Sequence, residues 1–463
     1  MTTAKKIGII GAGIGGLTAG SLLTKQGHKV TLFERESCVG GRALTFQGKH
    51  LIKSTYLNQL QRFNLHLPFA DPDIDTIFAK HLLNGYSFDF GFHVIGGGVV
   101  SNLNHLFSLL EEPPMQMAET RLAYINEKGY RYPFLSTLDK IKMIPNILRL
   151  LLAGEKKMKE LDAVPMSDTI HRYGKGKMKL TLELFSRVIT TVNDLHSIST
   201  GEAFRAQKNL LSGSKPVGYP HTGLQSISNE LVHYLTTHGA TIHLNTPVTN
   251  VDIAQNKVVG LKTQESTFSF DAIISNVPVQ QLFSLVDKQI FPKDYVNTLQ
   301  RLEGTGSLCA YYALDTIPSD LLGKTFLFIE RDVGLQGNDA VGMIDCMTAH
   351  PNSGMAPPEK YLIQAYIICS PSEAKDISLL MKLKTVLDAN LEKIMPHYHD
   401  HLQWALYPAI WQLDGVAKTI DNDKPSIQTP VQGFYLVGDC VKAPGVGYNC
   451  AVNAGKLVSS LFS

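Results

Sequence analysis

A glycine-rich hexapeptide near the N-terminus, GAGIGG at residues 11–16, restricts the fold more than any other part of the 463-residue chain. Its glycines have separate uses where a strand turns into a helix around a pyrophosphate. Gly11 allows the tight turn, Gly13 lets the backbone approach the phosphates, and Gly16 lets the helix pack closely on the strand. Gly15 lies in the same turn, and we expect it to contact the same ligand.

The segments on both sides of the hexapeptide have the patterns that this interpretation needs. Residues 6–10 form an apolar run, residues 14–26 have helical spacing, and residues 29–34 form a second apolar run. This order predicts the α/β class with a parallel sheet, with the helix N-terminus facing the phosphates. Glu34 ends the second run, where its carboxylate accepts both hydroxyl hydrogens of an adenosine ribose. The alternative is a glycine-rich turn beside an exposed glutamate.

The residues after Glu34 narrow the nucleotide to FAD through a family resemblance. RESCVGGRALTF, residues 35–46, resembles the two-glycine-plus-arginine extension of flavin amine oxidases, phytoene desaturases and protoporphyrinogen oxidases. The resemblance implies that FAD is the cofactor and that Arg35, Gly41 and Arg42 lie beside it. A guanidinium offers a planar set of donors to phosphate or flavin oxygens. A surface ion pair is the alternative role for Arg42.

A second resemblance to the same superfamily lies at the C-terminus, in GFYLVGDCVKAPGVGYNCAVNAG at residues 433–455. It implies that Gly438 and Asp439 follow a strand and that Asp439 binds the ribityl chain of FAD. Gly447 and Tyr448 begin the last helix, whose N-terminal dipole stabilises negative charge on the flavin. A turn or a helix cap is the alternative role for Asp439.

Two further segments carry the same resemblance. GYPHTGLQSISNELVHYL and the following ATIHLNTPVTNVDI are similar to the phytoene-desaturase segment beside the adenine, which implies that Val248 contacts that ring. YSFDFGFHVIGGG, residues 86–98, resembles the segment along the flavin face in phytoene desaturases, carotenoid isomerases and retinol saturases. It makes His93 the candidate catalytic residue, as an acid, a base or a hydrogen-bonding group at neutral pH. A packed or solvent-facing histidine is the alternative.

The motifs are spread along the chain, so we expect two interleaved domains rather than domains in series. The Rossmann-like FAD-binding domain is assigned residues 1–95, 216–285 and 400–463. The mixed α+β substrate-binding domain is assigned residues 96–215 and 286–399. The first part of the substrate-binding domain has helical patterns and is expected to form a helical subdomain.

Charge and cysteine content argue against several other classes of protein. The chain has 43 basic and 41 acidic side chains, a net charge of +2, so no nucleic-acid partner is expected. The six cysteines form no CxxC pair, no metal site is expected, and the protein is assigned to the cytoplasm. No apolar run is long enough to span a membrane. Residues 140–159 fit either a peripheral helix on a membrane surface or an amphipathic helix over the core.

The combined prediction is an FAD-dependent oxidoreductase of desaturase, saturase or isomerase type. It moves hydride between flavin and an apolar, unsaturated or isoprenoid-like substrate in a long apolar cleft. A flavin amine oxidase is one alternative: Tyr448 is near one aromatic position of that family's cage, but residues 442–444 (KAP) stand at the second. The other is an FAD-free prenyl carrier resembling Rab GDP-dissociation inhibitors, against which Glu34, Arg42 and Asp439 argue. Electron acceptor, reaction direction and oligomeric state are left open.

Overall fold

The computed structural model describes all residues of the chain except 1–2, 92–93, 99–100, 212–216 and 351–352. The fold is mixed α/β, and it contains the parallel sheet that the glycine-rich motif predicts. The five strands of this sheet pair in parallel in the order β11-β2-β1-β15-β21. Their bounds are β1 Lys6–Ile10, β2 Lys29–Phe33, β11 Thr241–His243, β15 Ala272–Ser275 and β21 Phe434–Leu436. The strands β1 and β15 are almost wholly buried, as expected when both faces of a parallel sheet are covered.

A group of helices packs beside the parallel sheet, around α1. The helix α1 is buried over most of its length because α10, α13 and α4 pack against it. A Cβ atom at Gly455 of α13 would lie 2.7 Å from the Thr18 side chain of α1, so the two helices cross closely at this glycine. The bounds are α1 Ile14–Lys25, α4 Asn102–Leu110, α10 Gln225–Thr237 and α13 Tyr448–Ser459.

A small antiparallel sheet, β12-β13-β14, packs against β15 of the parallel sheet. Its first two strands are joined by Gln255 and Asn256, whose φ angles of 50° and 58° are those of a two-residue hairpin turn. Asparagine tolerates such angles better than most residues do, which is why it occurs there. The bounds are β12 Val248–Ala254, β13 Lys257–Thr263 and β14 Thr267–Ser269.

The second large sheet has eight strands in the order β4-β20-β16-β19-β18-β17-β8-β9, and α12 (Ile377–Ile394) packs on it. Two of its strands, β4 and β20, lie within the segments assigned to the FAD-binding domain. Both belong to this sheet because β20 pairs antiparallel with β4 on one side and β16 on the other. The bounds are β4 Leu65–Asp71, β8 Arg121–Asn126, β9 Gly129–Arg131, β16 Gly306–Leu314, β17 Lys324–Leu335, β18 Asn338–Asp345, β19 Tyr361–Cys369 and β20 Leu402–Ile410.

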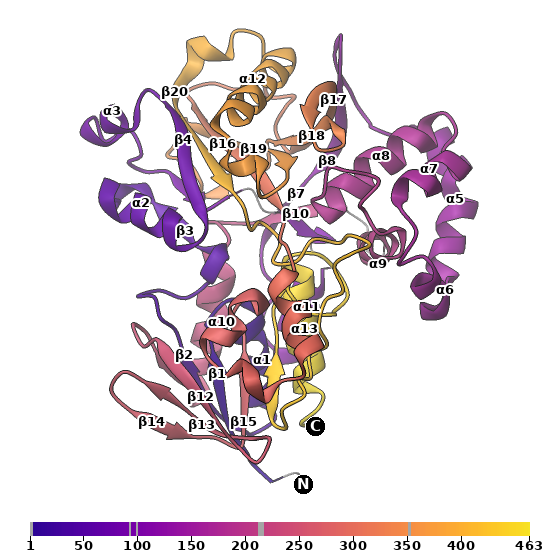
Figure 1. Ribbon diagram of the computed structural model, residues 1–463. Coiled ribbons are helices and arrows are strands. Elements are labelled where there is room, and N and C mark those ends of the chain that lie inside the picture. The colour runs from indigo at the N-terminus through magenta and orange to yellow at the C-terminus, as the bar shows by residue number, and fades with distance from the viewer. Residues whose placement is uncertain (1–2, 92–93, 99–100, 212–216, 351–352) are drawn as a thin grey trace.

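A lobe of five helices, α5 to α9, projects from the side of the molecule (Figure 1). The lobe lies within residues 96–215, where helices are expected, and this region also contains α4 and, after it, the strands β7, β8 and β9. The strand β8 forms because β17, distant in sequence, offers it a parallel partner. The bounds are β7 Met117–Glu119, α5 Thr137–Leu152, α6 Glu155–Glu160, α7 Met166–Tyr173, α8 Lys177–Thr190 and α9 Thr200–Leu211.

Short elements complete the fold. The strand β10 pairs with β6 and β7, and β3 pairs with β5. None of the helices among the described residues is long and apolar enough to cross a membrane. The bounds are α2 Lys53–Arg62, α3 Ile74–Ala79, α11 Lys293–Arg301, β3 Thr45–Gln47, β5 Ser87–Asp89, β6 Ile95–Gly96 and β10 Val217–Pro220.

Candidate cofactor and substrate site

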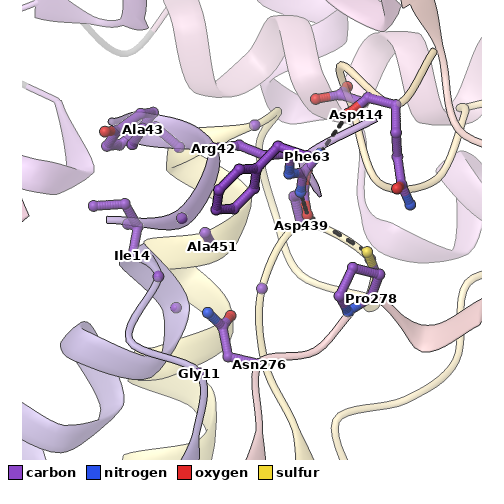
Figure 2. Close-up of a pocket in the computed structure, with 18 of the residues that line it drawn as sticks. Gly11, Ile14, Arg42, Ala43, Phe63, Asn276, Pro278, Asp414, Asp439 and Ala451 are labelled. Atoms are coloured by element: carbon purple, nitrogen blue, oxygen red, sulfur yellow. Dashed lines mark hydrogen bonds and ion pairs between the residues drawn. The ribbon is translucent and has the colours of Figure 1, made fainter. Parts of the chain in front are cut away.

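A cavity of about 660 Å³ opens at the carboxyl ends of β1, β15 and β21, the edge where parallel α/β sheets bind ligands (Figure 2). It brings together twelve of the thirteen residues that the sequence assigns to the cofactor. These are Gly11, Gly13, Gly15, Glu34, Arg35, Gly41, Arg42, Val248, Gly438, Asp439, Gly447 and Tyr448. Segments more than 400 residues apart in the chain therefore meet in one wall.

The thirteenth residue, Gly16, lies just behind the cavity wall. A Cβ atom there would be 2.2 Å from the carbonyl oxygen of Gly11, so only glycine lets the helix start this close to the strand. Gly13 and Gly15 face Asn276 instead: added Cβ atoms would lie 2.6 Å and 2.7 Å from its side-chain nitrogen and oxygen. The glycines form a cradle that any side chain would fill.

Glu34 holds the turn and faces the cavity at the same time. Its Oε2 accepts a hydrogen bond from the amide of Ala12 at 2.8 Å, and its Oε1 accepts one from the amide of Glu36 at 3.0 Å. Burial raises the pKa of Glu34 above its ordinary value. Each carboxylate oxygen has a further lone pair, so acceptors for ribose hydroxyls remain.

Arg42 and Asp439 form an ion pair inside the cavity wall. The Arg42 Nη2 lies 2.7 Å from Asp439 Oδ1, and its Nη1 donates to the carbonyl oxygens of Gln412 and Leu413 at 2.8 and 2.9 Å. Asp439 Oδ2 accepts a hydrogen bond from the amide of Gly415. The guanidinium is thus paired, as the alternative for Arg42 supposes, but in the cavity rather than at the surface.

Two helices point uncapped N-termini at the cavity. Neither α1, after Gly13, nor α13, after Gly447, has a side-chain cap or an acidic residue in its first turn. Gly447 has a φ of 47°, which a residue with a side chain rarely adopts. The N–H groups and the positive ends of both dipoles are therefore available to an anion.

Three more of the predicted cofactor residues line the cavity. Arg35 is half-exposed and pairs with Glu36, while Val248 begins β12. The Tyr448 hydroxyl is buried and has no partner among the described residues. His93 lies outside the described residues, so its catalytic role stays a prediction.

Asp89, in the predicted flavin-facing segment of residues 86–98, is buried and does not line the cavity. It accepts hydrogen bonds from the Thr45 and Tyr219 hydroxyls and from the amide of Leu224. Burial raises its pKa to about 6, which these donors only partly offset. Asp89 therefore ties β5 to β3 and β10, and it does so through neutral donors.

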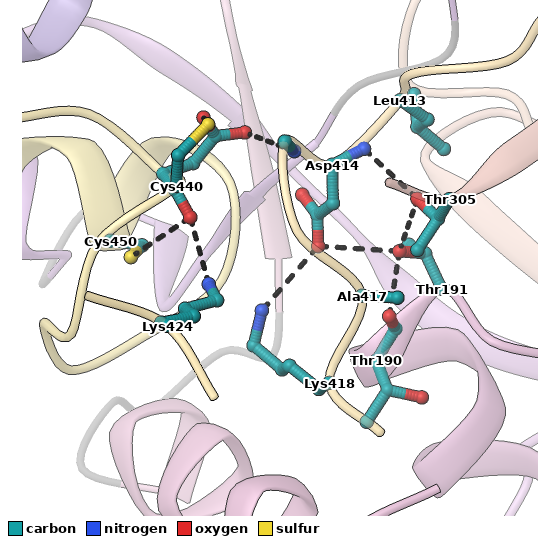
Figure 3. A network of polar contacts seen from close by, with 12 residues as sticks. Thr190, Thr191, Thr305, Leu413, Asp414, Ala417, Lys418, Lys424, Cys440 and Cys450 are labelled. Carbon is teal, nitrogen blue, oxygen red and sulfur yellow. Dashed lines mark hydrogen bonds and ion pairs between the residues drawn. The ribbon is translucent and has the colours of Figure 1, made fainter. Parts of the chain in front are cut away.

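Several cavity residues were missed in the sequence. Asn276 follows β15, and the rule that ligands lie at the carboxyl ends of parallel strands points to it. Asp414 also lines the cavity, in a loop with no motif. Figure 3 shows its Oδ2 joined to the Thr191 hydroxyl at 3.2 Å and to the buried ammonium of Lys418 at 3.5 Å. No pattern in the sequence brings these three residues together.

Lys424 is a second buried cation that sequence analysis missed. Its Nζ donates to the backbone carbonyl of Asp439 at 2.7 Å. Burial alone lowers the pKa of this ammonium, but the acidic groups around it raise the pKa above its ordinary value. Cys440 and Cys450 beside it are buried free thiols, as are the other described cysteines apart from the half-buried Cys38.

The shape and the donor set fit FAD. The glycine cradle and the two uncapped helices suit a pyrophosphate, and Glu34 offers acceptors to a ribose. The cations Arg42 and Lys424 favour an anion nearby. No group of three or more metal-ligating side chains occurs in the part of the chain that the structure describes.

Comparison with known proteins agrees with this site. The family model for flavin containing amine oxidoreductase matches residues 14–461. The chain is 21% identical to the 15-cis-phytoene desaturase of Solanum lycopersicum, over 98% of this chain and 77% of that protein. An oxidoreductase from Methanosarcina mazei has a similar structure, with a TM-score of 0.74, 19% identity, and coverage of 98% and 100% of the two chains. A putrescine oxidase aligns with a TM-score of 0.65 and 16% identity over 99% and 98%.

The fold and the cavity define a flavoprotein oxidoreductase with a Rossmann-like cofactor sheet. The chain belongs to the family of flavin containing amine oxidoreductases, and its cofactor is FAD.

Proposed function

We propose that the protein moves hydride between FAD and an apolar, unsaturated, isoprenoid-like substrate. The observation that carries the proposal is the composition of the cavity wall away from the cofactor cradle. Helices α8 and α9 and strands β10, β18 and β19 supply it with Val188, Ile189, Ala206, Val217, Met343 and Tyr366. A hydrocarbon buried against such side chains gains about 0.8 kcal/mol per CH₂ group.

The charges of the cavity argue against a cationic substrate. Asp414 is the carboxylate nearest the α13 N-terminus, but the buried Lys418 already neutralises it. Asp439 is likewise paired with Arg42. An ammonium ion would have to compete with these internal cations or enter without a counter-charge, at a cost of several kcal/mol.

The similar proteins support the isoprenoid and the amine candidates to different degrees. The phytoene desaturase similarity extends over nearly the whole chain, which favours a carotenoid-like hydrocarbon. The putrescine oxidase likeness concerns the fold alone. A flavin amine oxidase is therefore the second candidate, and Asp414 is the one observation that favours it.

In this proposal the protein chain binds and orients the substrate and the cofactor, and the cofactor carries out the redox chemistry. When bound, FAD supplies the ability to accept or donate a hydride. The α13 N-terminus places positive charge at its end of the cavity. The Arg42–Asp439 pair fixes the position of two side chains that line the cavity. The Tyr448 hydroxyl can donate to a polar atom of a ligand, and the apolar wall excludes water from the reacting carbon.

The test is anaerobic reduction of the bound flavin, followed by its absorbance. Long isoprenoid hydrocarbons are expected to bleach or reoxidise it, and putrescine and monoamines to leave it unchanged. Ile189→Asp places a carboxylate in the apolar wall and should slow the isoprenoid reaction at least about tenfold. The control Val259→Asp changes an exposed side chain of β13 and should leave the rate unchanged. Bleaching by amines with no response to isoprenoids would establish the amine oxidase instead.

A further inference from the structure

Exposed apolar side chains gather on one helix of the projecting lobe. Among the described residues, seven of the seventeen exposed large apolar side chains lie between residues 132 and 173, less than a tenth of the chain. Five of them are on α5. This α5 apolar face consists of Leu138, Ile141, Ile144, Leu148 and Leu152, which are 47–83% exposed.

The spacing of these residues puts them on a single stripe. They are separated by three, three, four and four positions, so they cover about a third of the helix circumference. Figure 1 shows α5 at the outer edge of the lobe, away from both large sheets. The other side of α5 packs on α9, so the exposed stripe is not a consequence of an unfolded helix.

Positive charge surrounds the α5 apolar face. Residues 128–179 contain twelve lysines and arginines but five aspartates and glutamates, an excess of seven positive charges. The rest of the chain, with 31 basic and 36 acidic side chains, has an excess of five negative charges. The small net charge of the whole protein therefore hides a strongly polarised surface.

The cations on α5 itself are available to a partner. Asp139, the single carboxylate of α5, is paired with Lys177 at 2.6 Å. Lys140, Lys142 and Arg149 flank the apolar stripe, and none of the residues that the structure describes forms an ion pair with them. An apolar stripe with cations on both flanks is the pattern of a helix that lies in a lipid interface.

We propose that the lobe docks on an anionic lipid bilayer through the α5 apolar face, with the helix lying in the plane of the interface. At 16 residues α5 is about 24 Å long, shorter than the hydrocarbon core of about 30 Å, so it lies on the bilayer and does not cross it. The stripe enters the headgroup and acyl boundary, and the flanking cations contact anionic headgroups.

The charge argues for a bilayer over a second copy of the chain. A symmetric dimer through this face would bring together two copies of the segment 128–179, each with an excess charge of +7, and the like charges would repel. A bilayer carries the opposite charge. The lobe also adjoins the cavity, since α8 and α9 supply its wall, so a substrate taken from the bilayer would enter beside Val188 and Ala206.

Vesicle binding tests the inference without any turnover. Full-length protein carrying FAD is incubated with vesicles of phosphatidylglycerol and phosphatidylcholine, or of phosphatidylcholine alone, and sedimented. We expect binding to the anionic vesicles that weakens steadily with added NaCl. The triple variant Leu138→Ser, Ile141→Ser, Leu148→Ser should weaken it at least about 50-fold.

A second variant and a matched control separate charge from apolar contact. Lys140→Gln, Lys142→Gln, Arg149→Gln should weaken binding to anionic vesicles about 100-fold at low salt, at roughly fivefold per charge. The control Ile377→Ser, Met381→Ser removes an exposed apolar pair from α12 and should change nothing. Wild-type FAD content in each variant shows that it is folded.

Two results would overturn the inference. One is that wild-type protein stays in solution with anionic vesicles, or that the triple serine variant binds these vesicles as tightly as wild type does. The other is a dimer, seen by light scattering, that the serine variant dissociates while vesicle binding is absent. Vesicle binding with no reaction of any isoprenoid would leave the docking inference intact and contradict the proposed function, so the two fail separately.

Discussion

Two buried aspartates, one at the cavity and one in the eight-stranded sheet, have pKa values that their surroundings shift in opposite directions. Burial raises the pKa of Asp439, but Arg42 and Lys424 lower it below its ordinary value. Asp345, on β18, is equally inaccessible to water and faces the Thr325 hydroxyl, the Gln364 amide and the amide of Met347. With no cation among these partners, burial raises its pKa to about 6.

The two aspartates belong to different halves of the molecule, the half that holds the cofactor and the half that supplies the apolar wall. The half that holds the cofactor keeps fixed charges inside the protein, which a charged ligand such as FAD requires. In the half that supplies the apolar wall, Asp345 is satisfied by neutral donors, so no cation opposes the effect of burial on its pKa. The following variants are ordered by the size of the effect that this comparison predicts.

Removing Asp439 should have the largest effect. Asp439→Ala removes the carboxylate that pairs with the partly buried Arg42 and lies near the buried Lys424, which costs about 3–5 kcal/mol of unfolding free energy and weakens FAD retention. Urea unfolding and the flavin content of purified protein measure the two consequences. Asp423→Ala is the control: it breaks the exposed pair with Lys442, 2.5 Å apart, and should change stability by less than about 1 kcal/mol. Equal losses in the two variants would show that the cavity pair is not special.

Asp345→Asn should change how stability depends on pH. The folded state keeps the Asp345 proton up to pH about 6 and the unfolded state releases it near pH 4, so stability from this group is full below pH 4 and is lost as the pH rises through 6. Asparagine does not titrate. Relative to wild type, the variant should gain up to about 3 kcal/mol between pH 4 and pH 7, measured by urea unfolding at each pH. Parallel curves would contradict a raised pKa.

Glu34→Ala should weaken FAD binding by about 1.5–3 kcal/mol, because the variant loses the acceptor for the ribose hydroxyls. Glu34→Gln keeps one acceptor oxygen, so its affinity for FAD should lie between those of Glu34→Ala and wild type. Titration of the apoprotein with FAD, followed by flavin fluorescence, gives the affinities. Unchanged affinity in both variants would assign Glu34 to the turn alone, through its bonds to Ala12 and Glu36.

Tyr448→Phe should have the smallest effect. The hydroxyl has no partner among the described residues, so its loss should leave the stability of the apoprotein within about 0.5 kcal/mol of wild type. If the hydroxyl donates to a ligand, affinity for that ligand should fall by about 0.5–1.5 kcal/mol. Thermal unfolding with and without FAD distinguishes an effect on the apoprotein from an effect on ligand binding. A large loss in the apoprotein would mean that Tyr448 is bonded within the protein.

The parts of the site that could be predicted are those whose backbone conformation demands particular residues. Gly13 and Gly16 are predictable because a side chain would collide with Asn276 or with the Gly11 carbonyl. Glu34 follows from its place at the end of a strand. Asp414 and Lys424 were missed because a lone acid or lysine in a loop looks the same in sequence whether it is buried or solvated.

The sequence by itself determined the cofactor half: a strand, a glycine turn and a helix are local features, so their residues can be recognised along the chain. Only the tertiary structure decided which sheet receives β4 and β20, which cation faces each buried carboxylate, and that the apolar stripe of α5 points outward. These depend on contacts between segments far apart in sequence. An alternating strand or an amphipathic helix specifies that one face is apolar, but the element that covers this face, if any, is set by the rest of the fold.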